Sequence, residues 1–568
     1  MLKDVGREMA GRSAATPGAP VRRGSAARGR AALLALAGLL LSGTAYAQDP
    51  TSTLIQQLEQ RLDEFERQNR VEQQGDPVVT DPLRRAELPA PGGPTITLLD
   101  VEFETDSEFI TDDELRVIAH EYIGRPIDFS EIARLVREVN DLYAERGVVT
   151  ASAVLPPQDL SSRVLKVRLV EGKLGSIAVV GERRTRDKLI LDRVRLVKGD
   201  RVVDVPTASR DITFSNRTSL MQIRMLLQPG ATFGLTDIAL GITEPPRNQL
   251  TAYIDNQGVE STGDVTGGLI WRHYGALGLD DSLLAFVTRS RGSVSGTLNY
   301  DLPISTFGTR LGLGYTGTGT TVVDGPAELL DVTGEAHAGT VTLSQALVAS
   351  TNWLVQANAS VSYGSSKSNI GPVPQVDALT TRVVVGLPIS YTGERHNFYV
   401  QPQIVYAHVE DQLAPAGING RDLVLYTGNG GGMLAFNERY SAHVRGAWQY
   451  TREELLPGNL LFNVGGPTTV RGYPSDGVAG DSGYYVQAEL ARRFTDGLQG
   501  LNAFLFADVG EVFSTFPDRT TLVSAGLGLS YDIGSQATFE LTAAFPILDA
   551  VADQSDVTVY GRLTARMF

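Results

Sequence analysis

The chain has 568 residues, of which 42% are hydrophobic, so it is long enough for several units with packed cores. Its net charge of −15 argues against nucleic acid as a partner. Cysteine is absent, which excludes disulfides and thiolate metal sites, and no run of about 18 uncharged apolar residues offers a membrane-spanning helix.

Residues 1–47 are predicted to be a secretory signal peptide. An apolar stretch from Ala31 to Leu41 is too short to span a bilayer, and the small-residue cleavage site Ala45-Tyr46-Ala47 follows it. Four arginines precede the stretch: Arg22, Arg23, Arg28 and Arg30. We therefore expect an exported protein that is cut after Ala47, with Met9 as an alternative start.

Residues 48–70 are predicted to hold one amphipathic helix. Its apolar residues recur at helical spacing: Leu54, Ile55, Leu58, Leu62 and Phe65. Polar residues cover the other face, which suits a helix that plugs a water-filled channel. An ordinary helix packed on a domain has the same apolar stripe and is the alternative. Residues 71–94 contain five prolines and predict an extended linker, not a fold.

Residues 95–171 and 172–244 are predicted to be two similar α+β units of β-α-α-β-β order. In the first unit, Thr111 and Ser130 are the expected caps of the two helices, and Gly147 ends the second helix. The second unit is predicted with a helix over 185–197 and a short, poorly marked helix near 208–214. Its expected strands cover 176–180, 220–227 and 235–242.

From residue 245 to residue 568 the hydrophobic pattern changes to period two. One predicted strand alternates apolar and polar residues, with Trp353 and Tyr363 at its two ends. Aromatic ends around an apolar middle are typical of a strand that faces lipid with a wet lumen behind it. The length of the region predicts a transmembrane β-barrel of about sixteen antiparallel strands. A soluble sandwich also alternates, but does not explain aromatic girdles on so long a run.

Several short motifs in this order resemble one family. They are Leu142–Gly147, Leu155–Leu160, Val170–Gly172, Leu227–Gly230, Asp255–Gly258, Tyr300–Pro303 and Val470–Tyr473, with Phe504, Phe506, Asp508 and Gly510 downstream. Together they are similar to the TpsB transporters of two-partner secretion, the haemolysin and filamentous-haemagglutinin secretion/activation type. The resemblance covers nearly the whole mature chain. It implies a plug helix, a linker, two POTRA domains and a sixteen-stranded barrel in the outer membrane.

A candidate site follows from the phase of one barrel strand. Phe504, Phe506 and Asp508 share one face, and the opposite apolar face must meet lipid, so Asp508 is predicted to point into the lumen. The segment around Arg471 and Gly472 is then expected to fold inward. Arg471 would pair bidentately with Asp508, Tyr473 would stack near the two Phe rings, and Gly510 lies on the same strand.

Glu489 is a second possible acceptor for Arg471. In the simpler alternative, Arg471 is an ordinary arginine of a loop. The resemblance implies the same lock between a loop and the barrel wall. Phe568 does not follow the alternation of the last predicted strand, because it is out of phase with the apolar residues of that strand.

No catalytic constellation, metal site or cofactor motif is evident, so we expect no enzyme and no cofactor. Gly428–Gly432 lacks the Lys-Ser/Thr of a phosphate loop and is predicted to be a turn. Three functions remain: an exporter of a large partner protein, a barrel-assembly insertase, and a passive porin.

The exporter is favoured because a solute pore needs no protein-capturing units. Its expected partners are the secreted exoprotein, outer-membrane lipid and, during biogenesis, the barrel-assembly machinery. The cargo is expected to add as a strand to an exposed POTRA edge, with 176–180 and 235–242 as candidate strands.

Overall fold

The computed structural model describes residues 78–80 and 90–567, apart from short gaps. The gaps are residues 149, 199–201, 233, 416, 476, 514–518 and 552–553. The predicted signal peptide (1–47) and plug helix (48–70) therefore lie outside the described residues. No helix in the described part of the chain is long and apolar enough to cross a membrane.

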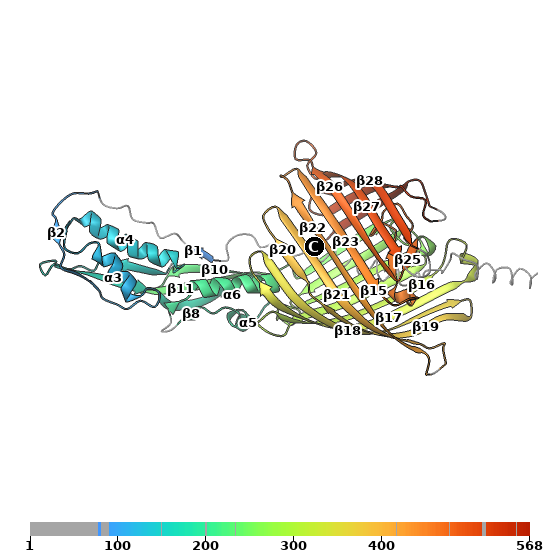
Figure 1. Cartoon of the computed structure of the whole chain (residues 1–568), viewed down its shortest axis with the longest axis horizontal. Coiled ribbons are helices and arrows are strands. Elements are labelled where there is room, and N and C mark those ends of the chain that lie inside the picture. Colours follow the sequence, from blue (N-terminus) through green and yellow to red (C-terminus); the bar gives the residue numbers. More distant parts are fainter. Residues whose placement is uncertain are drawn as a thin grey trace, which may run out of the picture. The chain divides into compact units, whose positions relative to one another are not determined.

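The first α+β unit packs two helices on a small sheet (Figure 1). Its elements are β2 (Ile96–Thr97), β3 (Asp100–Phe103), α3 (Asp112–His120), β4 (Pro126–Ile127), α4 (Phe129–Glu145), β5 (Ala151–Val154) and β6 (Val164–Glu171). β6 lies between β3, which is parallel to it, and β5, which is antiparallel. Apolar residues of both helices and of β6 form one core around Leu135, Tyr143 and Val167.

The helix starts differ in one detail from the sequence prediction. Thr111 caps α3 as expected, in a reciprocal capping box with Glu114. The prediction for α4 was wrong, because Asp128 and not Ser130 is the N-cap. The Asp128 carboxylate accepts hydrogen bonds from the Glu131 backbone N–H (3.0 Å) and from the Ser130 hydroxyl (2.5 Å), so Ser130 already lies inside the helix. An aspartate two residues earlier is an equally strong cap signal.

The second α+β unit contains β7 (Lys173–Val180), α5 (Asp187–Leu191), β8 (Val197–Lys198), β9 (Val202–Val203), α6 (Val205–Thr218), β10 (Gln222–Pro229) and β11 (Leu235–Thr243). The relative lengths of its helices were predicted wrongly. α5 has five residues, whereas α6 has fourteen. The sequence underrated α6 because part of its buried face is polar. Asn216 is buried there, and its side-chain amide both donates to and accepts from the backbone of Ile223.

The sheet of the second unit has the order β1-β10-β11-β7-β9-β8. β1 (Val78–Thr80) comes from the predicted linker and pairs in parallel with β10, so this part of 71–94 is not an isolated extended segment. β11 lies between β10 and β7. The expectation that 235–242 could receive a cargo strand was therefore wrong, because both edges of that strand are already paired.

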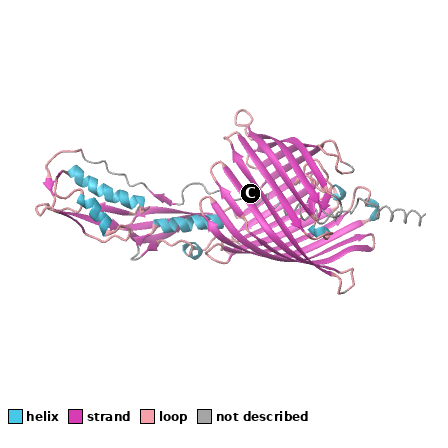
Figure 2. Cartoon of the chain, in the orientation of Figure 1, coloured by secondary structure: helices cyan, strands magenta, loops and turns pink. Residues whose placement is uncertain are grey.

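Most of the remaining described residues form a closed antiparallel barrel (Figure 2). The strands are β12 (Asn248–Asp255), β13 (Thr266–Tyr274), β14 (Ser282–Arg289), β15 (Ser293–Pro303), β16 (Thr309–Thr321), β17 (Val332–Ala349), β18 (Trp353–Ile370), β19 (Val373–Gly386), β20 (Ile389–Thr392), β21 (His396–Asp411), β22 (Gly420–Ala435), β23 (Tyr440–Thr451), β26 (Ser482–Arg493), β27 (Leu501–Phe513), β28 (Thr520–Ile533), β29 (Ala537–Pro546) and β30 (Thr558–Arg566).

β19 and β20 both lie between β18 and β21, so they are one strand interrupted near Pro388, and these seventeen labelled strands make sixteen positions. The prediction of about sixteen strands is confirmed. The barrel closes where β12 pairs with β30. At this seam the Arg562 guanidinium donates to the fully buried Asp255 carboxylate at 3.0 Å. In the described connections of the barrel, three short 3-10 helices occur: η1 (Glu260–Thr262), η2 (Glu328–Leu330) and η3 (Gly458–Leu460).

The outer surface of the barrel carries the apolar phase of each strand. On β18, for example, Val361 and Tyr363 are exposed, with fractional exposures of 51% and 59%. Such a surface requires lipid around it. On β30 the exposed phase includes Val559 and Leu563, and Phe568 lies outside the described residues.

The turn predicted at Gly428–Gly432 was wrong, because these residues lie inside β22. A Cβ on Gly428 would lie 2.2 Å from the ring of Trp448, and one on Gly431 would lie 3.1 Å from the ring of Tyr399. The glycines therefore leave room for aromatic rings of the two neighbouring strands, β21 and β23, which lie over β22. Adjacent glycines therefore indicated close side-chain packing here and not a change of chain direction.

Candidate functional site

The candidate site is the contact between one long connection and the inner wall of the barrel. Residues 452–481 join β23 to β26 and contain a small hairpin of β24 (Phe462–Val464) and β25 (Val478–Gly480). We call residues 452–481 the lid loop. Its segment Val470–Tyr473 is buried and makes hydrogen bonds to residues of β27, β28 and β30, so the loop lies inside the barrel.

Arg471 is the centre of this contact. Its Nε and one terminal nitrogen donate to the two oxygens of Asp508 on β27, both at 2.7 Å, and its backbone N–H donates to Asp508 at 3.1 Å. The other terminal nitrogen donates to Glu489 on β26 at 2.5 Å. The Arg471 side chain is only 7% exposed and the Asp508 side chain is fully buried. One guanidinium thus joins the lid loop to two neighbouring strands of the wall through charge-assisted bonds.

The face of Arg471 rests on an aromatic ring. Its guanidinium carbon lies 3.6 Å from the centroid of the Phe506 ring, which is a cation–π contact. Phe504 and Phe506 lie across β28 at Gly528 and Gly526, where an added Cβ would come within 2.2 Å and 2.5 Å of the respective rings. The two Phe side chains are therefore packed flat on the wall and are not free in the lumen.

Gly472 and Tyr473 complete the contact. The Gly472 N–H donates to the Tyr560 hydroxyl at 2.9 Å, in a backbone conformation (φ +95°) that favours glycine. Tyr473 does not stack near the Phe pair as predicted. Its hydroxyl lies within hydrogen-bond distance of two carbonyl oxygens, those of Val523 (2.8 Å) and Leu548 (2.9 Å), and its ring packs in the apolar cluster of the small hairpin. The place over Phe506 is taken by Arg471 itself.

Gly510 lies directly under the lid loop. A Cβ at this position would lie 2.5 Å from Val464 Cγ1 and 2.8 Å from Val470 Cγ2. Only glycine lets the lid loop approach β27 so closely. Beside the contact, a cavity of about 400 Å³ is bordered by Arg471, Glu489, Phe504 and Tyr399, so open space adjoins the lid loop in the lumen.

The structure brings together Arg471, Gly472, Phe504, Phe506, Asp508 and Gly510, and it includes Glu489 as an acceptor. Sequence reasoning missed Tyr560, Gly526 and Gly528. The two glycines had a usable signal, because glycines two residues apart in a strand mark a place where large side chains of a neighbour lie flat. Tyr560 had no local signal. Among the described residues no cluster of His, Asp and Glu could hold a metal ion.

Two family models match the chain. A POTRA domain of ShlB type matches residues 96–172, and the haemolysin secretion/activation protein ShlB/FhaC/HecB matches residues 234–531, which is more than half of the chain. The first match covers the first α+β unit, and the second match covers most of the barrel, including the lid loop.

Individual proteins are similar over much of the chain. The heme/hemopexin transporter protein HuxB of Haemophilus influenzae is 21% identical over 505 residues, which are 81% of this chain and 85% of that protein. The solved structure of CdiB from Escherichia coli covers 93% of this chain and all of its own, with a TM-score of 0.65 and 19% identity. BamA from Haemophilus ducreyi, without its first three POTRA domains, covers 83% of this chain with a TM-score of 0.52 and 14% identity, which shows a shared fold.

Proposed function

The chain belongs to the haemolysin secretion/activation family of ShlB, FhaC and HecB, and from that premise we propose that it exports one large partner protein through its barrel without ATP. It is an outer-membrane transporter whose α+β units lie in the periplasm. The family is one of transporters and not of enzymes. One observation carries the proposal: a POTRA domain, which is a type of domain that captures proteins, is joined to a barrel, and the bonds of Arg471 attach the lid loop to the inner wall of that barrel.

The two alternatives have weaker support. Family membership favours export over barrel assembly, and the likeness to BamA concerns the fold alone. A passive porin has no use for a POTRA domain. We further propose that the second α+β unit is a second POTRA domain. Apart from strands of two residues, its elements follow the β-α-α-β-β order of the first unit, and in both units the first long strand pairs in parallel with the last.

Deleting the gene tests the proposed function. The proteins of the culture medium are compared by mass spectrometry between cells with and without the transporter. We expect one large protein to disappear from the medium of the deletion strain and to return when the gene is restored. An unchanged medium, with the transporter abundant in the wild-type outer membrane, would contradict export. The protein found in this way is called the cargo below.

We propose that β7 is the edge to which an extended segment of the cargo adds as a strand. Among the described residues, β9 pairs with β7 only at Lys173, so the rest of β7 has one side without a neighbouring strand. Its Ile177 and Val180 are 41% and 40% exposed, and apolar side chains on an unpaired edge favour strand addition. The outer edge of β10 is covered by β1 over three residues.

Charges on this edge are expected to weaken cargo binding. We expect the double variant Ile177→Lys, Val180→Lys to bind an unfolded cargo segment at least about tenfold more weakly, because charged side chains oppose strand pairing. The measurement is titration calorimetry with the full-length transporter in detergent. Val117→Lys on α3, where Val117 is 70% exposed, is the matched control and should bind as the wild type does. Equal binding by the double variant would exclude β7 as the edge.

We propose that the bonds of Arg471 hold the lid loop in the lumen in the geometry that export requires. The amphipathic segment 48–70 is proposed as a plug of the lumen, on the resemblance and its sequence pattern alone. Outer-membrane lipid around the apolar outer surface, and the barrel-assembly machinery during biogenesis, are the remaining proposed partners.

A further inference from the structure

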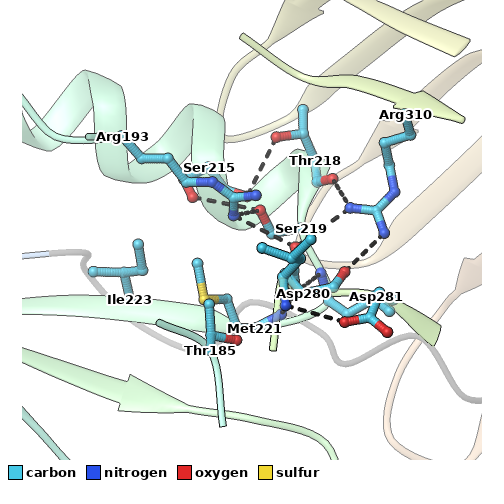
Figure 3. Close-up of polar contacts among 12 residues, drawn as sticks. Thr185, Arg193, Ser215, Thr218, Ser219, Met221, Ile223, Asp280, Asp281 and Arg310 are labelled. Atoms are coloured by element: carbon cyan, nitrogen blue, oxygen red, sulfur yellow. Dashed lines mark hydrogen bonds and ion pairs between the residues drawn. The ribbon is translucent and has the colours of Figure 1, made fainter. Parts of the chain in front are cut away.

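A buried acidic residue joins the second α+β unit to the barrel. Asp280 lies in the turn between β13 and β14, in a left-handed conformation (φ +64°), and its side chain is fully buried. Two arginines approach it from opposite sides, Arg193 from the second unit and Arg310 from β16, as Figure 3 shows. A non-glycine residue in this backbone conformation, with a buried charge, is costly and points to a specific role.

Both carboxylate oxygens of Asp280 are used. Oδ2 accepts from Arg193 at 3.4 Å and from Arg310 at 3.3 Å. Oδ1 accepts from the Tyr274 hydroxyl at 2.9 Å and from two backbone N–H groups of the second unit, those of Leu220 (3.2 Å) and Met221 (3.1 Å). Leu220 and Met221 lie immediately before β10. The barrel turn therefore binds the backbone at the start of a strand in the sheet that contains β7.

The two arginines are themselves buried. The side chain of Arg193 is 5% exposed and that of Arg310 is 11% exposed. Burial lowers the pKa of the Arg193 guanidinium, and Arg310 adds to this effect, whereas Asp280 opposes it. Arg310 also donates to Asp301 on β15 at 2.6 Å. Without the carboxylate of Asp280, Arg193 would lose this ion pair, and Arg310 would keep its pair with Asp301.

A second set of contacts holds the same turn against the second unit. The backbone N–H of Arg186 donates to the Gly278 carbonyl at 3.1 Å. Asp281 shapes the turn from within, since it accepts from the N–H groups of Leu277 and Leu279 and from the Tyr300 hydroxyl. The turn is thus built by the barrel and presented to the second unit as a fixed surface.

We propose that Asp280 is a positioning residue: it docks the second α+β unit on the barrel so that a cargo strand held at β7 is delivered to the lumen. This inference rests on the proposed function. It differs from the lid-loop contact, because Asp280 touches the periplasmic unit and not the lid loop. The only covalent connection between the unit and the barrel is the short segment between β11 and β12, so Asp280 supplies a second point of attachment.

The test is Asp280→Asn, which keeps the size of the side chain and an acceptor for Leu220 and Met221 but removes the charge between the arginines. We expect cargo secretion to fall at least about tenfold while cargo binding and barrel level stay unchanged. Asp324→Asn is the matched control, because Asp324 forms an exposed pair with Arg291, with a side chain 68% exposed. Normal secretion by Asp280→Asn would overturn the proposal.

A distance measurement separates positioning from general stability. The sequence has no cysteine, so spin labels at Lys188→Cys on α5 and Thr351→Cys in the turn before β18 report one distance. We expect a narrow distribution in the wild-type background and a broad one with Asp280→Asn. An equally narrow distribution in both proteins would show that Asp280 does not position the unit.

A disulfide across the joint should restore secretion. A Cβ at Gly275 would lie 3.2 Å from the Cβ of Arg184, a few tenths of an ångström from the usual range for disulfides, so Arg184→Cys with Gly275→Cys should cross-link despite the strained φ of +72°. We expect the cross-link to form and to rescue Asp280→Asn only under oxidising conditions. Cross-linking without rescue, or no cross-linking in the wild-type background, would contradict the docking role. If the wild type itself exports no cargo, the proposed function fails instead.

Discussion

Replacing Arg471 by alanine is expected to reduce cargo secretion sharply while the barrel still inserts. The variant leaves the Asp508 carboxylate fully buried without its partner, and stranding a buried charge costs about 3–5 kcal/mol. The lid loop also loses its contact with Phe506 and with Glu489. Secretion is measured as cargo in the medium, normalised to folded barrel in the outer membrane.

Asp508→Ala should have a similar effect, because it strands the Arg471 guanidinium. The double variant should be impaired less than the sum of the two single variants, since both changes remove the same interaction. Arg291→Ala is the matched control: Arg291 is 62% exposed and pairs with Asp324 on the surface. Full secretion by Arg471→Ala at normal barrel levels would contradict the lock.

Replacing Gly510 by leucine is expected to displace the lid loop without changing any charge. Even the Cβ of the new side chain would overlap Val464 and Val470, whereas the wall strand itself is held by its ladder of hydrogen bonds. We therefore expect a loss of secretion comparable to that of Arg471→Ala.

The control for this variant is Gly339→Leu on β17. An added Cβ at Gly339 meets no atom within 4 Å, and neighbouring residues of the same phase, such as Val341, are exposed on the outer surface. The loss of secretion by Gly510→Leu should be accompanied by greater protease sensitivity of the lid loop. Gly339→Leu should not show this greater sensitivity. Normal secretion by Gly510→Leu, with the lid loop accessible to protease, would show that export does not depend on the position of the loop.

Features with a local physical cause could be predicted from the sequence. A strand between lipid and water must alternate, so the barrel and the inward direction of Asp508 followed from the phase of single strands. The pairing of Arg471 with Asp508 was predictable because two Phe residues beside a lumen-facing aspartate are unusual in a wet channel unless another segment packs on them, and the segment with Arg471 was the natural candidate. The position of Tyr473 was not, because its acceptors on Val523 and Leu548 are backbone carbonyls, which carry no sequence signal.

Features that depend on distant residues escaped prediction. Helix α6 buries small and polar residues whose partners come from β10, so its face looked weak in isolation. The joint at Asp280 unites Arg193 and Arg310 from two different units, and neither arginine stands out by spacing or motif. The aspartate pair 280–281 can be read in the sequence, but loops and turns commonly contain aspartate, so its buried environment could not be inferred.

Site-specific photocross-linking tests whether cargo passes through the lumen of the barrel. Tyr399 and Phe398 are neighbours on β21: Tyr399 borders the lumen cavity, whereas Phe398 is 41% exposed on the outer surface. A photoreactive phenylalanine at each position is activated during secretion, and adducts are detected with an antibody to the cargo. We expect cargo adducts at position 399 and none at position 398. Adducts at 398 alone, or at neither position while secretion proceeds, would contradict export through this barrel.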